Sequence, residues 1–252
     1  SSHDGVFAYV RVTGADTHMV EIKHIITKGT WPVYSLFRIE DAQEVFVYNC
    51  QFLGTAMFNT TTTLGVFLLI NTHLTVFEQN MFFDLYYDDD GTLQASAEYY
   101  YPRYWINVYD ATSTSNGSIT GMVLIIRNNV FDELVSTAQI NLSPIAGAIE
   151  YVLIENNMFN YAKDNASVVR KSIYAYGTDN TSVKRLEVKG NKWAWTNASK
   201  PVDITKTTYA LIEGNNMPSP GLGVFATNTD TKLHVINNTI NGGVTSSALQ
   251  TI

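Results

Sequence analysis

The chain has 252 residues, a formal net charge of −7, 15% charged residues and 45% hydrophobic residues. The sparse charge excludes a solvated, disordered chain, and the acidic balance excludes a nucleic-acid partner, which needs a basic face. Apolar runs stay below the ~18 residues of a membrane span, and a single cysteine excludes an internal disulfide framework. The chain begins Ser1-Ser2-His3-Asp4 without a leader, so we expect a mature product or an excised fragment.

Strand-like runs follow one another along the whole chain, and no segment repeats its apolar residues with a period near 3.6. The first strand is expected at Val6–Val12. Further strands are expected at Leu36–Ile39, Val66–Ile70, Ile106–Tyr109, Ala138–Leu142, Ile173–Tyr176, Val202–Ile204 and Val224–Thr227. These runs predict an all-β protein.

A second set of strands ends in one repeated phrase, which reads Asn or Gly, then Asn, any residue, and a large apolar residue, with weaker copies at Val45–Phe52 and Thr75–Phe82. One copy is Leu124-Ile125-Ile126-Arg127-Asn128-Asn129-Val130-Phe131. We call the second polar position the marker; it is occupied by Cys50, Asn80, Asn129, Asn157, Asn191, Asn215 and Asn238. Unequal spacing around a constant phrase indicates fixed rungs joined by loops of variable length. The 49 residues from Asn80 to Asn129 equal two units, or one unit with a long insertion.

Each position of the phrase predicts a structural role. The residue before the marker is Asn, Gly or Gln in every copy, and Asn and Gly readily adopt a left-handed backbone, so a sharp bend is expected there. The markers are expected to stack as a buried asparagine ladder, in which Cys50 replaces an asparagine and is not a catalytic thiol. Two residues later, the apolar residues Phe52, Phe82, Phe131, Phe159, Trp193, Met217 and Ile240 are expected to stack as an internal column.

With these rungs, the chain resembles the right-handed parallel β-helix, or pectate-lyase-like, superfamily. The resemblance runs from about Val20 to Ile240 and implies one single-stranded solenoid domain, 1–252, of about nine rungs with an asparagine ladder and an aromatic and aliphatic stack. The domain is expected to belong to a longer chain or an assembly. A β-sandwich or a propeller is the alternative architecture. Loop insertions are expected near 83–105 and 110–121.

The insertion near 83–105 carries the candidate site. Its aromatic residues suit stacking on sugar rings and are the candidates for carbohydrate or partner binding: Tyr86, Tyr87, Tyr99, Tyr100, Tyr101, Tyr104 and Trp105. Its carboxylates Asp88, Asp89 and Glu98 are the catalytic candidates, because glycoside cleavage uses a pair of acids. No metal site is predicted elsewhere; Ca²⁺ on Asp88 and Asp90 is the only cofactor considered. The alternative is a solvated turn beside a subunit contact.

Seven Asn-x-Ser/Thr sequons are candidate glycosylation sites: Asn59, Asn116, Asn141, Asn165, Asn180, Asn197 and Asn237. Unmodified turn residues are the alternative. Four glutamates, Glu78, Glu155, Glu187 and Glu213, are expected to face outward and to pair with cations such as Arg127 and Lys189. A sugar-binding groove is the other interpretation of these charges.

The resemblance implies no single activity, because the motif sets of pectate lyases and polygalacturonases are absent from this chain. We therefore predict an extracellular, cell-surface or virion-surface scaffold that presents loops to a glycan or partner. One alternative is a tailspike-like polysaccharide depolymerase, either a lyase or a glycoside hydrolase. Another is a structural subunit of a surface filament or layer. Because neither end carries a cap, self-association by trimerisation or end-to-end stacking is expected.

Overall fold

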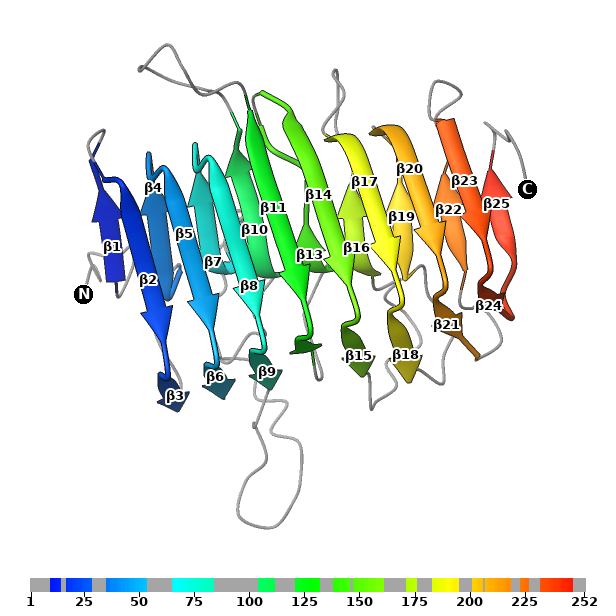
Figure 1. The fold of residues 1–252 in the computed structure, drawn as a ribbon, viewed down its shortest axis with the longest axis horizontal. Coiled ribbons are helices and arrows are strands. Elements are labelled where there is room, and N and C mark those ends of the chain that lie inside the picture. The colour runs from blue at the N-terminus through cyan, green and yellow to red at the C-terminus, as the bar shows by residue number, and fades with distance from the viewer. Residues whose placement is uncertain are drawn as a thin grey trace, which may run out of the picture.

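The computed structural model describes residues 10–14, 17–28, 35–53, 65–83, 104–111, 121–131, 138–145, 147–160, 171–175, 183–194, 201–205, 207–218, 223–226 and 232–246. Within them all regular structure is β-strand, and the strands form a right-handed parallel β-helix (Figure 1). Each coil passes in turn through three parallel sheets, which we call A, B and C. The predicted fold class is confirmed, with nine described strands in sheet A and eight each in sheets B and C.

Sheet A contains the first strand of every coil, and its strands pair in chain order. They are β1 (Val10–Thr13), β4 (Phe37–Glu40), β7 (Gly65–Ile70), β10 (Tyr104–Asp110), β13 (Ala138–Asn141), β16 (Lys171–Ala175), β19 (Val202–Ile204), β22 (Val224–Ala226) and β25 (Val244–Ser246). Seven of them overlap the strand runs predicted between 36 and 227. Of the predicted strand Val6–Val12, residues 6–9 lie outside the described residues.

Sheets B and C complete the coils. Sheet B comprises β2 (Met19–Lys23), β5 (Glu44–Tyr48), β8 (Leu74–Glu78), β11 (Met122–Arg127), β14 (Ile149–Glu155), β17 (Val183–Lys189), β20 (Thr207–Glu213) and β23 (Lys232–Ile236). Sheet C comprises β3 (Ile26–Lys28), β6 (Gln51–Leu53), β9 (Met81–Phe83), β12 (Val130–Phe131), β15 (Met158–Asn160), β18 (Lys192–Ala194), β21 (Asn216–Met217) and β24 (Thr239–Ile240).

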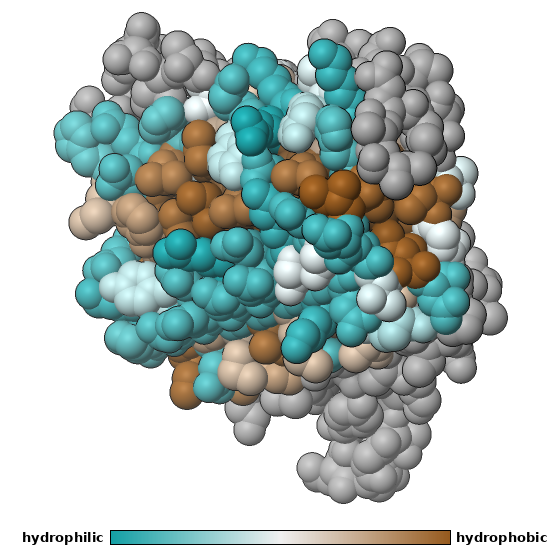
Figure 2. All heavy atoms as spheres, turned by 45° about the vertical axis from the view of Figure 1, so that its right-hand side comes forward, coloured by the Kyte–Doolittle hydropathy of each residue, from teal (hydrophilic) through white to brown (hydrophobic). Residues whose placement is uncertain are grey.

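The outer face of sheet B carries more apolar surface than an outward strand face usually does. In β8 and β11, residues Leu74, Val76, Val123 and Ile125 alternate with core residues and are half-buried. Figure 2 shows this face with a hydrophobic band between hydrophilic margins, interrupted by one hydrophilic strip. Polar outward positions are the norm for a sheet with one solvated face, so this band needs an explanation.

The bend between sheets B and C has the same backbone in every described coil. The residue before the marker has a positive φ of 53–64° at His24, Asn49, Gln79, Asn128, Asn156, Gly190, Gly214 and Asn237. A left-handed residue at this place reverses the strand within two residues, and Asn and Gly tolerate it best. The predicted left-handed bend is confirmed. It also occurs in the first coil, at His24, where the marker is Ile25 and the phrase lacks its asparagine.

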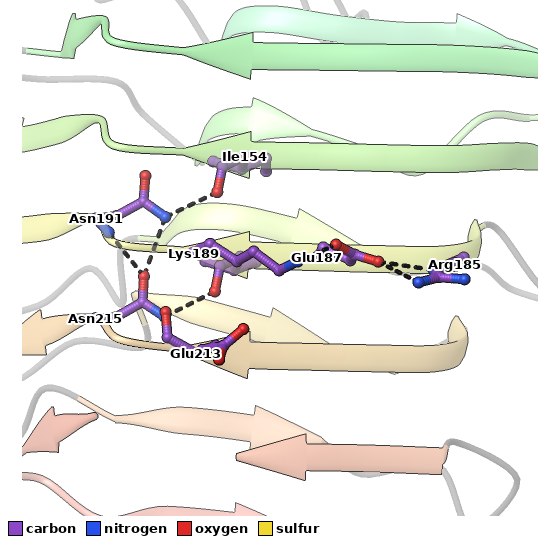
Figure 3. A network of polar contacts seen from close by, with 8 residues as sticks. Ile154, Arg185, Glu187, Lys189, Asn191, Glu213 and Asn215 are labelled. Atoms are coloured by element: carbon purple, nitrogen blue, oxygen red, sulfur yellow. Dashed lines mark hydrogen bonds and ion pairs between the residues drawn. The ribbon is translucent and has the colours of Figure 1, made fainter. Parts of the chain in front are cut away.

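The markers form the predicted asparagine ladder, and each asparagine bonds to the next. Asn191 donates from its backbone N and from Nδ2 to Oδ1 of Asn215, at 2.9 and 3.0 Å. The same Nδ2 donates to the carbonyl oxygen of Ile154 in the preceding coil, at 2.9 Å (Figure 3). Asn80, Asn129 and Asn157 repeat this arrangement. The ladder satisfies buried turn amides that a closed two-residue bend leaves without strand partners.

An apolar column runs parallel to the ladder inside the solenoid. The rings of Phe82, Phe131, Phe159 and Trp193 stack in consecutive coils at centroid distances of 4.8, 5.2 and 4.9 Å. Phe52 begins the column, 5.1 Å from Phe82. These side chains are at most 2% exposed, and inward residues of all three sheets pack against them in one core. The predicted column is confirmed.

The ladder is continuous between Asn80 and Asn129, where the sequence spacing is widest. The backbone N of Asn80 donates to Oδ1 of Asn129 at 2.9 Å, which is the geometry of adjacent coils. The 49 residues therefore make one coil, and its extra length lies in 84–103 and 111–121, between strands. The interval from Asn80 to Asn129 is therefore one repeat unit with insertions, and the alternative of two units is wrong.

Candidate functional site

The three corners of the coil differ in how much length variation they contain. The corner between sheets B and C always has two residues, from the first coil (24–25) to the last (237–238). The corner between C and A ranges from three residues at 241–243 to twenty at 84–103, and the corner between A and B reaches eleven at 111–121. Both variable corners border sheet A. Its outer face is therefore the face flanked by variable connections on both sides, which is where rigid scaffolds place functional loops.

A row of polar and aromatic side chains crosses that outer face. The register aligns Asn107, Asn141, Tyr174, Asp203 and Phe225 in five consecutive strands, β10, β13, β16, β19 and β22. Their neighbours along each strand are core residues, so alternation puts the row on the outside of sheet A. We call these five residues the sheet A row.

The sheet A row begins with two stacked carboxamides. Asn141 Nδ2 donates to Oδ1 of Asn107 at 2.7 Å, and the two residues are 5% and 1% exposed. The Oδ1 atom of Asn141 is buried, and in the described part of the chain it has no hydrogen-bond partner. A buried acceptor without a partner costs free energy, so this end of the row is a locally unfavourable part of the scaffold.

An ion pair on an aromatic ring occupies the middle of the row. Lys171 Nζ lies 2.9 Å from Oδ2 of Asp203 and 3.4 Å from the ring centroid of Tyr174. The side chains of Lys171 and Asp203 are only 16% and 9% exposed. Each charge neutralises the other, and the low exposure means that solvent screens this pair less than it screens a surface ion pair.

Within the sheet A row, Tyr174 and Phe225 are half-buried and partly accessible, whereas Asn107, Asn141 and Asp203 are only 1–6% exposed. Aromatic rings suit the apolar ring faces of a sugar because they stack on them, and a phenol hydroxyl both donates and accepts. Among the described residues, no group of three or more His, Cys, Asp or Glu side chains is placed to hold a metal ion.

The predicted insertion site lies mostly outside the described residues. This holds for Tyr86, Tyr87, Asp88, Asp89, Asp90, Glu98, Tyr99, Tyr100 and Tyr101. Its first and last predicted positions are strand residues: Phe83 ends β9, and Tyr104 and Trp105 begin β10. In the chain, residues 84–103 connect the end of β9 in sheet C to the start of β10 in sheet A.

Two of the aromatic candidates are buried, and their predicted role as sugar-stacking faces is wrong. Tyr104 is 4% exposed and Trp105 is fully buried. Trp105 packs 5.6 Å from Phe82 of the internal column. Both residues belong to a strand in which consecutive side chains are buried, so their rings contribute to packing and not to recognition.

Five of the seven predicted glycosylation sites lie outside the described residues: Asn59, Asn116, Asn165, Asn180 and Asn197. Asn141 is wrong as a glycan site in the folded protein, because its Nδ2 is buried and bonded to Asn107. Asn237 is exposed at a left-handed bend, so its side chain is accessible.

Two of the four glutamates on sheet B, Glu78 and Glu187, pair with cations as expected. Arg127 Nη2 lies 2.8 Å from Oε2 of Glu78 in the adjacent coil. Glu187 is 3% exposed and lies between Lys189, at 2.5 Å, and Arg185, whose Nε donates at 2.8 Å (Figure 3). Burial alone raises the pKa of Glu187, but the hydrogen bonds from Lys189 and Arg185 outweigh it and hold the pKa below its usual value. These charges are structural pairs.

Cys50 occupies a ladder position, as predicted. Its backbone N donates to Oδ1 of Asn80 at 3.0 Å, and its Sγ lies 3.6 Å from the carbonyl oxygen of Ile22. The residue is 1% exposed, and burial raises the pKa of its thiol, which favours the unreactive protonated form.

Sequence reasoning missed the sheet A row. A signal existed, since Asn107, Asn141 and Asp203 each interrupt an apolar run in a predicted strand. Only the register shows that these interruptions align in adjacent coils.

In comparisons with known proteins, no family model, no curated protein and no solved structure matches this chain. Among the described residues, no helix is long and apolar enough to cross a membrane. The class of protein is therefore defined by its fold, a right-handed parallel β-helix, and the relation to pectate-lyase-like proteins remains a resemblance.

Proposed function

We propose that this protein is a surface scaffold that binds an extended, uncharged polysaccharide along the outer face of sheet A. One observation carries the proposal: both variable corners of the coil border this face, whereas the third corner has two residues in every described coil. A rigid stack with variable loops beside one face is suited to recognition, and an extended polymer matches a row that runs along the solenoid axis.

The chemistry of the sheet A row supports a glycan as the partner. Tyr174 and Phe225 offer half-buried aromatic rings on this face, whereas Asn107 and Asn141 are at most 5% exposed and link β10 to β13 through their carboxamide hydrogen bond. Lys171 is already neutralised by Asp203, so this part of the row does not attract an acidic polymer. The tyrosines of the 84–103 insertion are the predicted complement at the border of the face. An extracellular, cell-surface or virion-surface location follows from such a ligand and is part of the proposal.

A glycan array with neutral and acidic polysaccharides tests this function. The chain with Tyr99, Tyr100 and Tyr101 changed to Ser is expected to lose binding at least about tenfold, as is Phe225→Ala. Tyr174→Phe removes one hydroxyl group and is expected to weaken binding less. Tyr209→Phe on sheet B is its matched control and should bind normally. Unchanged binding in both the triple variant and Phe225→Ala would refute the proposal.

The same polysaccharides distinguish a binder from a depolymerase. After incubation, new reducing ends or unsaturated products would show cleavage by a hydrolase or a lyase. In that case the carboxylates Asp88, Asp89 and Glu98 are the first to substitute. Binding without product supports the scaffold function.

A further inference from the structure

The hydrophobic band on sheet B forms a defined surface. We call it the apolar stripe: Phe46, Leu74, Val76, Val123, Ile125, Tyr151 and Leu153, all outward-facing and half-buried on β5, β8, β11 and β14. The register of the parallel strands places these residues side by side along the solenoid axis, where they form the hydrophobic band (Figure 2). A contiguous apolar surface on a low-charge protein is typical of an interaction site.

A column of charges borders the apolar stripe on the side of the asparagine ladder. In successive strands it reads Tyr48, Glu78, Arg127, Glu155, Lys189 and Glu213. We call it the charged column. From Glu78 to Glu213 the charges alternate in sign. If a second column is placed end for end against the first, about the midpoint between Arg127 and Glu155, each of the four central charges lies opposite a charge of the other sign.

We propose that two copies of this chain pack sheet B against sheet B, with antiparallel solenoid axes and a two-fold axis between β11 and β14. The axis lies along the strands, so β11 faces β14 of the second copy, and β8 faces its β17. Arg127 then lies opposite Glu155 of the second copy, and Glu78 lies opposite its Lys189. Each contact occurs twice, as an isologous interface requires.

At the margin of the stripe, Leu74 lies opposite Arg185 of the second copy, whose charge is already paired with Glu187. The positions nearer the charged column agree with this arrangement. Ile125 meets Leu153 of the second copy at the centre, and Phe46 meets its Leu211. Tyr48 lies opposite Glu213 of the second copy, where a phenol can donate to a carboxylate. Glu187 faces the stripe of the other copy, but it is already buried and neutralised by Arg185 and Lys189, so it brings no unpaired charge into the interface.

Charge decides between this packing and the parallel one. A two-fold axis along the solenoid would place each coil against the same coil of the second copy, with strands reversed. The charged column would then face the column of Leu74, Val123, Tyr151 and Arg185. Lys189 would lie against Arg185, and Arg127 would lie against Val123. Such contacts pair like charges and bury unpaired ones, both of which are costly.

The size of the face sets the expected affinity. Eight strands at ~4.8 Å and three outward positions at ~6.8 Å give a face of about 34 Å by 14 Å, or roughly 1,000 Å² over both copies. This area is near the lower limit for a specific interface, so the dimer is expected to be weak and to depend on concentration.

Sedimentation of the full chain over a concentration series tests the proposal. The wild type is expected to shift from one to two copies. Ile125→Arg is expected to weaken the dimer at least about tenfold, because it places charge at the apolar centre. Met158→Arg is the matched control, since Met158 is an exposed apolar residue on the outer face of sheet C. This control should dimerise normally.

A mixing experiment tests the orientation. Arg127→Glu alone places two glutamates opposite each other at each contact, and Glu155→Arg alone places two arginines there. Each variant is expected to be a monomer, whereas an equimolar mixture regains opposite charges at both contacts and should dimerise. Charge contacts within one chain do not change on mixing, so recovery reports pairing between copies only.

Three outcomes overturn the proposal. A wild type that stays monomeric up to its solubility limit removes the dimer. Trimers, or a mass that grows without limit and persists in Ile125→Arg, indicate association through another surface. Dimers without recovery in the mixture show that the antiparallel register is wrong.

Discussion

Asn157 donates from its backbone N and from Nδ2 to the single Oδ1 atom of Asn191, at 2.8 and 3.0 Å. Asn129 makes the same pair of bonds to Asn157. Each side chain in the ladder is thus an acceptor for the coil before it and a donor to the coil after it. Removing one asparagine leaves buried donors unpaired in the neighbouring coil as well as in its own.

Asn157→Ala is therefore expected to lower the free energy of unfolding by about 3 kcal/mol or more, because two buried donors of Asn129 lose their acceptor. Urea unfolding followed by circular dichroism measures the change. Asn156→Gly is the control, since it changes the neighbouring, exposed residue and keeps a backbone that tolerates positive φ. Equal stability of the two variants would contradict the energetic role of the ladder.

Phe159→Ala tests the apolar column. The ring is fully buried between Phe131 and Trp193, so its removal leaves a cavity and is expected to cost ~3–5 kcal/mol. The neighbouring Met158 is 42% exposed, and Met158→Ala is expected to cost less than about 1 kcal/mol. A small effect at Phe159 would show that the coils do not depend on this column.

Cys50→Asn is expected to stabilise the protein by about 1 kcal/mol. An asparagine at this ladder position can donate to the carbonyl oxygen of Ile22, which the thiol approaches only weakly, and can offer Oδ1 to the backbone N of Ile25. Urea unfolding of Cys50→Asn beside Cys50→Ser makes the comparison. Native Cys50 should also resist thiol reagents until the chain unfolds. Rapid labelling of the folded protein would contradict the burial of this residue.

Glu187 predicts a pH dependence of stability. Its pKa is lower in the folded chain than the ordinary value of 4.5, so the unfolded chain binds its proton more readily. The stabilisation is complete above the ordinary pKa and is lost as the pH falls through the folded value.

Glu187→Gln is expected to cost about 1–2 kcal/mol at pH ~7, a value discounted because Arg185 is largely exposed. Urea unfolding of both proteins from about pH 7 to about pH 3 should show this difference shrinking in acid. A constant difference over that range would mean that the carboxylate charge is not what stabilises the coil. Glu150→Gln, in an exposed pair with Lys184, is the control and should have little effect.

The repeated phrase was sufficient to predict the ladder, the left-handed bend and the apolar column, because each arises from residues within one short segment. The first coil escaped the pattern, since Ile25 stands where the ladder has asparagine. The burial of Trp105 was not predictable from its tyrosine-rich neighbours; it depends on Phe82, which is distant in sequence.

The sheet A row and the apolar stripe could not be predicted from the sequence, for a different reason. Asn107 and Asn141, or Ile125 and Leu153, become neighbours only through the register of strands that are about 30 residues apart. An isolated strand such as Leu124-Ile125-Ile126 is apolar on both faces, and its sequence does not say which side faces outward. The coil length, which varies from one turn to the next, had to be known first.

The bend between sheets B and C always has two residues, so the way in which one coil stacks on the next does not depend on how many residues the coil contains. The twenty residues of 84–103 enter one coil, yet the Asn80–Asn129 bond is as short as the Asn129–Asn157 bond, where the intervening connections are much shorter. A segment added at either corner of sheet A therefore leaves the stacking of later coils in place. This makes the solenoid a suitable host for grafted peptides: foreign sequences can be inserted at several coils independently, displayed along one face at a pitch of ~4.8 Å, and exchanged without redesigning the core.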